Sequence, residues 1–313
     1  MVRFRDTGSS SGTFLSLLPA VVPLAALLAG CDGGSSGNSG PIPAISPGHE
    51  LGTVDGVGFA TPASVLHDEA VDIYFVSNVN GEPLAKDGNG FISRMDPAGR
   101  VMGIRWIEGG EDGVELNGPK GMAILGDTLY VADIDCVRLF NRRSGDPMGS
   151  VCPDGAENLY DVAVKRRGPL YASDRSGALF AIEGDGRWTE VLRGDSLGEP
   201  TGIATSLRGV FVAGFQNRSV SQLWPEELKP FVRGRNWKLT GLTISEDGSF
   251  VFSNWADSTL LFIQASKGGS RGNIFTLLQD VPTPGDIGYD AKRDRILVPV
   301  LEQNRVFFVD LWS

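Results

Sequence analysis

The sequence predicts an all-β fold, in which residues 51–313 form one six-bladed β-propeller of four-stranded antiparallel blades. Three observations support this prediction. A phrase of strand-like segments recurs at intervals of about 40 residues, a spacing typical of propeller blades. The 42 glycines and 18 prolines separate aromatic and β-branched runs, as expected for short strands joined by tight turns. Runs with helical periodicity are scarce.

The clearest copy of the repeat consists of Gly118–Ile124, Thr128–Asp133 and Cys136–Phe140. The other five copies open with segments that begin at Ala63, Tyr160, Thr201, Thr240 and Gly285. Each copy adds a fourth strand, as at Val101–Ile107 and Glu190–Arg193. One such sheet cannot bury both of its faces alone, whereas six sheets around an axis bury them against each other.

The two ends of the repeat region predict how the ring closes. The last copy ends with Val306–Asp310, and the sequence reaches Ser313 without an outer strand for that blade. We expect residues 51–58 to supply this strand. Pairing of the N-terminal and C-terminal strands then closes the ring and leaves few exposed sheet edges.

The first fifty residues are typical of an export signal and a linker. Arg3 and Arg5 precede the apolar stretch Phe14–Ala29, and Leu28-Ala29-Gly30-Cys31 resembles the lipobox of bacterial lipoproteins. The resemblance implies a signal peptide over residues 1–30 and lipid on Cys31. An ordinary signal peptide that contains a cysteine is the alternative. Residues 31–50, rich in Gly, Ser and Pro, are predicted to form a flexible tether.

This arrangement predicts a lipid-anchored protein of the bacterial cell envelope that faces the periplasm and has the bilayer as a partner. Asp32 resembles a signal for retention in the inner membrane, but the choice of membrane stays open. We expect a monomer.

Charge and histidine content exclude several function classes. The net charge of -10 would repel phosphate backbones, so we expect no nucleic-acid partner. The chain has two histidines, His49 in the tether and His67 late in an apolar run. This scarcity argues against Ser-His-Asp triads and histidine-rich zinc sites, and His67 is better explained as a strand-end residue than as a catalyst.

Two propeller families resemble this pattern. Pro119–Asn141 is similar to an NHL repeat, and the whole ring resembles the six-bladed gluconolactonase and regucalcin-like propellers. Both resemblances imply the same fold but different functions. NHL propellers mostly bind partners, whereas gluconolactonase-like propellers hydrolyse lactones with a metal in the central channel.

The second resemblance implies Glu, Asn, Asn and Asp ligands at the openings of four inner strands. The aligned positions here are Ala63, Tyr160, Thr201 and Thr240, none of which carries a carboxylate or an amide. An alignment shifted by one residue brings Ser64, Asp161, Gly202 and Gly241 to the ring instead. We therefore expect that no cofactor is required, although a divalent cation such as Ca²⁺ stays open.

Other polar residues are predicted to gather at one mouth of the channel. Asp133 and Asp174 each end a second strand, and Asp161 and Asp286 open inner strands. All four are weak candidates for metal ligands, and Lys120 is a candidate cation for an anionic ligand group. Alternatively, these four aspartates cap backbone N–H groups in turns, as short acidic side chains often do.

The loops of the blades offer two further expectations. Phe215, Trp237 and Trp255 lie in loops of neighbouring blades and either form a stacking surface or fill the space between blades. Residues 79–90 form a long loop that we expect to arch over the mouth. Asp87–Ile92 within it resembles the middle of an EF-hand loop but lacks the acids at both ends and the flanking helices.

Cys136 and Cys152 are predicted to form a disulfide, because they begin and end two strands joined by a hairpin turn. The predicted ligand-binding residues are Lys120, Tyr160, Asp161, Thr201, Thr240, Asp286, Trp237 and Trp255. The expected function is non-catalytic binding of a small ligand or a protein at the propeller mouth. The alternative is a metal-dependent lactone or ester hydrolase.

Overall fold

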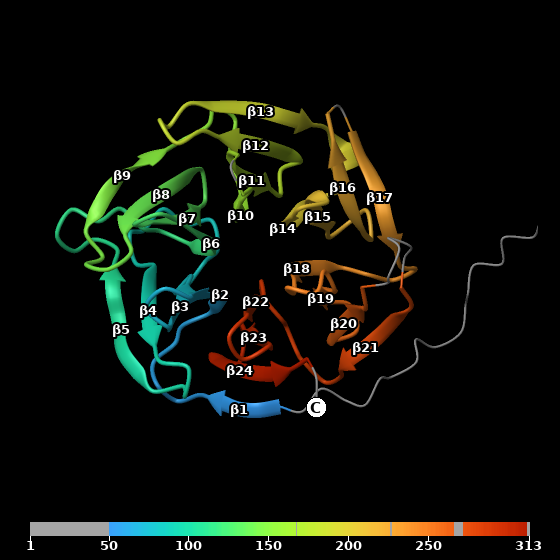
Figure 1. The fold of residues 1–313 in the computed structure, drawn as a ribbon. Helices are drawn as coiled ribbons and strands as arrows, with labels where there is room; N and C mark the ends of the chain where they lie inside the picture. The colour runs from blue at the N-terminus through green and yellow to red at the C-terminus, as the bar shows by residue number, and fades with distance from the viewer. Residues whose placement is uncertain (1–49, 167, 226, 266–271, 312–313) are drawn as a thin grey trace, which may run out of the picture. The chain divides into compact units, whose positions relative to one another are not determined.

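The computed structural model describes residues 50–166, 168–225, 227–265 and 272–311, which form six four-stranded antiparallel sheets around a central axis (Figure 1). The predicted six-bladed propeller is confirmed. Among these residues the one helical segment is the short 3-10 turn η1 (Asp195–Leu197), and no helix is long and apolar enough to cross a membrane. The predicted signal peptide, Cys31, Asp32 and the tether up to residue 49 lie outside the described residues.

The first five blades each use four consecutive strands. Blade one has β2 (Pro62–Asp68), β3 (Ile73–Asn78), β4 (Phe91–Met95) and β5 (Val101–Glu108). Blade two has β6 (Pro119–Leu125), β7 (Thr128–Asp133), β8 (Cys136–Asn141) and β9 (Pro147–Val151). Blade three has β10 (Leu159–Val164), β11 (Leu170–Asp174), β12 (Ala178–Ile182) and β13 (Trp188–Arg193). Blade four has β14 (Pro200–Ser206), β15 (Gly209–Gly214), β16 (Ser219–Trp224) and β17 (Glu227–Arg233). Blade five has β18 (Leu239–Ile244), β19 (Phe250–Asn254), β20 (Thr259–Ile263) and β21 (Ile274–Leu278).

Blade six combines both ends of the described chain. Its strands are β22 (Gly288–Asp290), β23 (Arg295–Val300), β24 (Arg305–Asp310) and, on the outside, β1 (Glu50–Val54). Val54 lies opposite Val306 in this last antiparallel pair. The predicted closure of the ring is confirmed, and the strand begins at Glu50.

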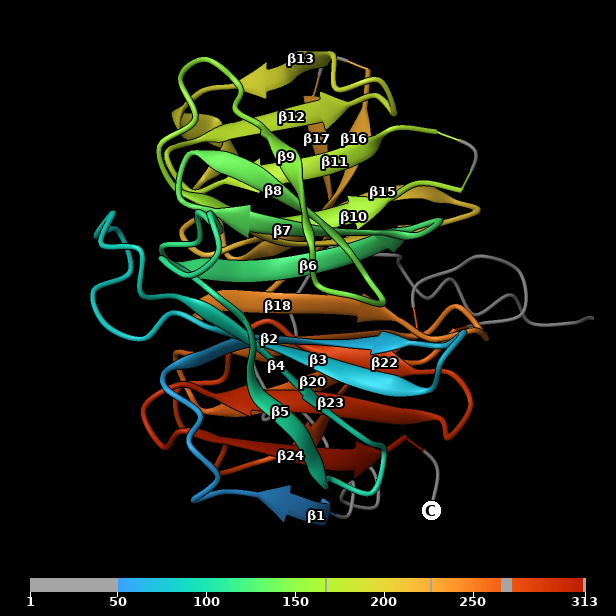
Figure 2. The same ribbon diagram turned by 90° about the vertical axis from the view of Figure 1, so that its left-hand side faces the viewer.

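The first strand of each blade lies next to the central axis, and the fourth lies at the rim (Figure 1). Figure 2 shows β2, β6 and β18 running in the same direction. The inner strands therefore open at one end of the channel, which we call the mouth.

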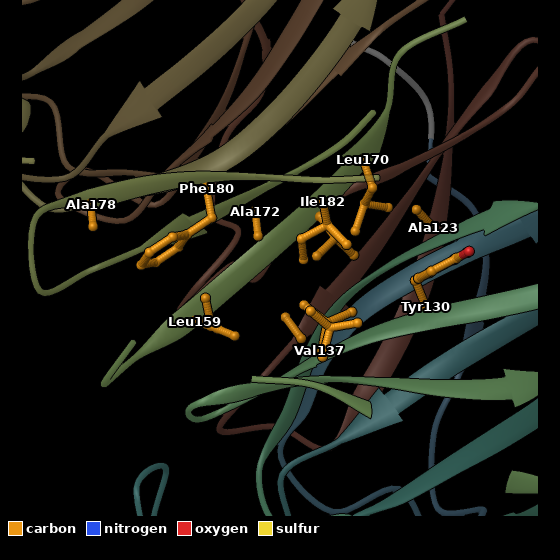
Figure 3. Close-up of a cluster of buried hydrophobic side chains, with 12 residues drawn as sticks. Ala123, Tyr130, Val137, Leu159, Leu170, Ala172, Ala178, Phe180 and Ile182 are labelled. Carbon is orange, nitrogen blue, oxygen red and sulfur yellow. The ribbon is translucent and has the colours of Figure 1, made fainter. Parts of the chain in front are cut away.

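Apolar side chains between neighbouring blades form the core. Between blades two and three, Tyr130 and Val137 contribute to one cluster with Leu159, Leu170 and Phe180 (Figure 3). Second strands are buried on both faces because each sheet packs between two others, which explains their nearly continuous apolar sequences. Phe180 is fully buried, and removal of such a ring costs about 3–5 kcal/mol.

A polar network joins blades one and six where the ring closes. His67 has Nε2 3.0 Å from Asp72 Oδ1 and Nδ1 3.3 Å from Asp290 Oδ1. Arg293 donates to both carboxylate oxygens of Asp72 at 2.8 and 2.7 Å, and to Asp290 at 2.9 Å. The Tyr74 hydroxyl also donates to Asp290. His67 is thus a strand-end residue in a structural network, as its position in the sequence indicates.

The predicted disulfide is confirmed. Cys136 at the start of β8 is bonded to Cys152 directly after β9, with their Cα atoms 4.1 Å apart. The two residues lie opposite each other because the adjacent Val137 and Val151 are register partners. The bond holds the outer strand of blade two to its neighbour.

Candidate functional site

A narrow ring, which we call the waist, divides the central channel into two cavities. It takes one residue from each blade: Ser64, Gly121, Asp161, Gly202, Gly241 and Asp286. A Cβ atom on Gly202 would lie 2.6 Å from the Leu242 nitrogen, and one on Gly241 would lie 2.6 Å from the Ile287 nitrogen. Glycine at these positions therefore lets neighbouring inner strands approach closely.

The mouth cavity lies on the side where the inner strands open and has a volume of about 470 Å³. Ala63, Lys120, Tyr160 and Thr240 line it from the inner strands. Glu82–Ala85 line it from the long loop of blade one, which projects beyond the sheets in Figure 2. The expectation that this loop covers the mouth is confirmed.

Lys120 is the most unusual residue of the mouth cavity. Its side chain is buried, and Nζ donates to the carbonyl oxygens of Pro83 and Gly118 at 3.2 and 3.1 Å. No carboxylate forms an ion pair with it among the described residues. Burial lowers the pKa of the Lys120 ammonium from 10.5 to about 8, although Asp133 acts in the opposite direction.

Arg175 adds a second cation and links the polar part of this cavity to its aromatic part. Its guanidinium lies 4.7 Å from the ring centre of Phe215 and 5.6 Å from that of Tyr160. It also donates to Glu199 at 2.5 Å. Sequence reasoning missed Arg175, but its position directly after Asp174 at the mouth end of β11 could have indicated it.

A second cavity of about 520 Å³, which we call the side cavity, opens between the loops of blades four and five. Arg218, Asn236 and Lys238 line it, together with Phe215 and Trp255, which also line the mouth cavity. The two cavities are therefore neighbours across this aromatic pair.

The three predicted aromatic residues differ in exposure. Trp237 is only 5 % exposed, and its ring centre lies 5.1 Å from that of Phe252 in the core between blades four and five. Phe215 and Trp255 are partly exposed in the cavities. Trp237 thus fills the space between blades and also lines the side cavity, while Phe215 and Trp255 are more exposed.

The two predicted threonines are occupied by contacts to the backbone. The hydroxyl of Thr201 donates to the carbonyls of Ala213 and Leu239 at 3.1 and 2.9 Å, and the residue is fully buried. Thr240 lines the mouth cavity, but its hydroxyl donates to the Pro284 carbonyl at 2.8 Å. Both side chains connect neighbouring blades.

Tyr160, another predicted ligand-binding residue, lines the mouth cavity, and burial raises the pKa of its hydroxyl group.

Asp133 and Asp174 cap backbone groups in the loops at the mouth. Asp133 accepts hydrogen bonds from the Asn117 and Gly118 nitrogens at 3.0 and 2.7 Å. Asp174 accepts bonds from the nitrogens of Glu157, Asn158 and Ser176. Asn78 and Asn254 accept equivalent bonds in blades one and five. These bonds fit the alternative interpretation of the sequence, in which Asp133 and Asp174 cap backbone N–H groups.

The expectation that Asp161 and Asp286 share the mouth is wrong. Both line the rear cavity, of about 300 Å³, at the opposite end of the inner strands. Asp161 accepts bonds from the Val162 and Ile203 nitrogens, each at 2.7 Å, and Ser64 donates to Asp286 at 2.7 Å. Both residues belong to the waist and face the rear cavity, whereas Lys120 precedes its own waist residue, Gly121, and lines the mouth cavity.

The electrostatics of this pair result from burial without a cationic partner. Burial, and then the charge of Asp286, raise the pKa of Asp161 well above its usual value. Burial raises the pKa of Asp286 to about 7. Its Oδ1 atom is buried and has no hydrogen-bond partner. Among the described residues, no group of three or more His, Cys, Asp or Glu side chains is placed to hold a metal ion.

Solved structures of proteins with several functions are similar to this chain at low sequence identity. Virginiamycin B lyase from Staphylococcus aureus aligns with a TM-score of 0.59 and 11% identity over 83% of this chain and 98% of its own. A putative gluconolactonase aligns with a TM-score of 0.61 and 14% identity over 86% of this chain and 93% of its own. The PQQ-bound aldose sugar dehydrogenase from Streptomyces coelicolor aligns with a TM-score of 0.63 and 15% identity over 86% of this chain and 99% of its own.

No protein-family model and no curated protein sequence matches the chain. At these identities the structural likeness establishes the propeller fold and leaves function to be argued from the site.

Proposed function

We propose that this chain is a lipid-anchored cell-envelope protein whose propeller binds a small anionic ligand in the mouth cavity without transforming it. The observation that supports binding is Lys120, a buried ammonium group held by two backbone carbonyls and not by a carboxylate. A buried charge without a partner is costly, and an anion in the cavity would remove that cost.

The surroundings of Lys120 fit an anion that carries an apolar or ring-shaped part. Arg175, which also pairs with Glu199, places a guanidinium group beside Lys120, and Glu82 is the one acidic residue among those that line the mouth cavity in the described chain. Trp255 and Phe215 offer aromatic faces beside these charges. This combination favours a small carboxylate or phosphate over a neutral ligand.

The binding proposal is tested by calorimetric titration of the purified full-length chain with inorganic phosphate, acetate, citrate and galacturonate. Lys120→Met keeps the length of the side chain and removes the charge, so we expect at least about tenfold weaker binding. Lys229→Met, in the exposed outer strand of blade four, is the matched control. Affinity should also fall as pH rises through about 8, where Lys120 loses its proton. Equal affinities of both variants and the native chain would reject the proposal.

The anchoring proposal rests on the lipobox-like residues around Cys31 and is tested separately. In bacterial cells that express the full chain, Cys31→Ser should move the protein from the membrane fraction to the soluble fraction. Retention of the variant in the membrane fraction would contradict lipid anchoring.

Lactone or ester hydrolysis is a second candidate, favoured by the pKa of Lys120. An amine with a pKa of about 8 is partly neutral near neutral pH and can accept a proton from water. A metal-dependent version has less support, because Asp161 and Asp286 line the rear cavity and not the mouth cavity. A lactone panel, with and without Ca²⁺, decides: turnover that Lys120→Met abolishes would replace binding with catalysis.

A further inference from the structure

The mouth cavity and the side cavity together offer more than one binding position. They share Phe215 and Trp255 as lining residues, so the two cavities are adjacent at these rings. The side cavity is of similar size to the mouth cavity, at about 520 Å³ against 470 Å³. A ligand larger than one ring could therefore occupy both.

The charge along this path contrasts with that of the whole chain. The chain carries a net charge of -10, yet Lys120, Arg175, Arg218 and Lys238 line the two cavities. The described residues that line the side cavity include no acid. Arg218 donates to the Arg235 carbonyl at 3.0 Å, and the ammonium of Lys238 lies 5.2 Å from the ring centre of Phe215. Neither forms an ion pair among the described residues. The side cavity thus has two positive charges of its own for an anion.

Phe215 lies beside cations of both cavities. Phe215 has the Arg175 guanidinium at 4.7 Å and the Lys238 ammonium at 5.2 Å, one from each cavity. Trp255 is partly exposed beside it. Aromatic faces suit the apolar C–H face of a sugar ring, and the side-chain amides of Asn158, Gln216 and Asn236 suit its hydroxyl groups.

We propose that these two cavities form one groove for an acidic oligosaccharide of two or more uronate-type rings. One carboxylate pairs with Lys120, a ring stacks on Trp255 and Phe215, and a second carboxylate pairs with Arg218 and Lys238. This inference rests on the proposed function, because its first position is the anion site of the mouth. An acidic peptide carries the same charges but lacks the stacking ring, so the groove favours the saccharide.

The test compares galacturonate, trigalacturonate, maltotriose and triglutamate by titration of the full-length chain. Two linked positions add their interactions, so trigalacturonate should bind at least about tenfold more tightly than galacturonate. Maltotriose, which is neutral, and triglutamate, which has no ring, should each bind at least about tenfold more weakly than trigalacturonate. Equal affinity for triglutamate would overturn the saccharide assignment.

Two sets of variants show how much the side cavity and the mouth cavity each contribute to binding. Arg218→Gln with Lys238→Gln should remove the gain of trigalacturonate over galacturonate and leave galacturonate binding unchanged. Lys229→Gln, outside the groove, should change neither. If the double variant leaves the gain intact, the groove proposal fails and the anion site of the mouth stands. If Lys120→Met changes neither affinity, the proposed function fails as well.

Discussion

Blade six contains two buried aspartates, four residues apart, with opposite electrostatic surroundings. Burial acts to raise the pKa of Asp290, yet hydrogen bonds from Tyr74 and Arg293 and the proximity of His67 lower it below its usual value. Burial raises the pKa of Asp286 to about 7, and the hydrogen bond from Ser64 opposes this only in part. The first carboxyl group closes the ring between blades one and six, and the second belongs to the waist.

The comparison shows that neighbouring groups, more than burial, decide the charge of an interior carboxyl group in this propeller. Asp290 has a cation beside it and stays ionised. Asp286 has none in direct contact among the described residues, and Asp161 adds a second acid to the same cavity. Lys120 behaves as Asp286 does, with the opposite charge. Burial disfavours the charged form of each group, so it lowers the pKa of Lys120 and raises that of Asp286.

The largest expected effect is that of Asp290→Asn. The amide keeps the shape of the side chain but removes the negative charge opposite Arg293 and His67, and the loss of one partner of a buried ion pair costs about 3 kcal/mol or more. Urea unfolding of the full-length chain at neutral pH should show this loss of stability. An unchanged midpoint would mean that the charge of Asp290 does not hold blades one and six together.

The same substitution at the waist should have the opposite effect on the stability of the fold. Asp286→Asn removes a charge that has no cationic partner, and its amide oxygen can still accept the bond from Ser64. At pH values above about 7 the variant should be as stable as the native chain or more stable, by up to about 2 kcal/mol. A loss as large as that of Asp290→Asn would show that an unrecognised cation accompanies Asp286.

The pH dependence of stability should separate the two aspartates. An acid whose pKa rises on folding holds its proton more tightly in the folded state, so the stability it contributes is lost as pH rises from 3.8 towards about 7. The lowered pKa of Asp290 acts in the other direction, with stability lost as the solution becomes acidic. The stabilities of the native chain and of Asp286→Asn, measured by unfolding, should therefore diverge as pH rises from 3.8 to about 7. Parallel curves would contradict the raised pKa.

The blades could be predicted from the sequence because each is specified locally. Thr128–Asp133 and its counterparts in blades one, three and five are largely apolar strands that end in a polar residue, and turns follow at a regular spacing. The caps formed by Asp133 and Asp174 could also be anticipated, because an acid at a strand end can accept hydrogen bonds from backbone N–H groups in the loops at that end of the sheet. The strands depend on neighbours in the chain, and the caps depend on the loop that enters the same blade, 15 to 17 residues earlier.

The two sides of the waist could not be predicted. Tyr160 lines the mouth cavity and Asp161 lines the rear cavity, although they are adjacent in the sequence. Which of them faces which side depends on how closely the glycines of the waist approach the next blade, a long-range contact. The cations of the side cavity were missed for a similar reason, since Arg218 and Lys238 meet only through the loops of two blades.

The smallest expected effect is that of Ser64→Ala, and its pH dependence is more informative than its size. Ser64 donates to Oδ2 of Asp286 at 2.7 Å and helps the charged form more than the protonated one. Removal of the hydroxyl should cost about 1 kcal/mol, with a smaller loss in mildly acidic solution, where Asp286 holds its proton, than above about 7. Thermal unfolding on both sides of that pH measures the difference, and Asp286→Asn combined with Ser64→Ala is the control that should abolish it. A loss that is equal at both pH values would show that Asp286 does not change its charge in this range, so that a neighbouring cation, and not burial, governs the waist.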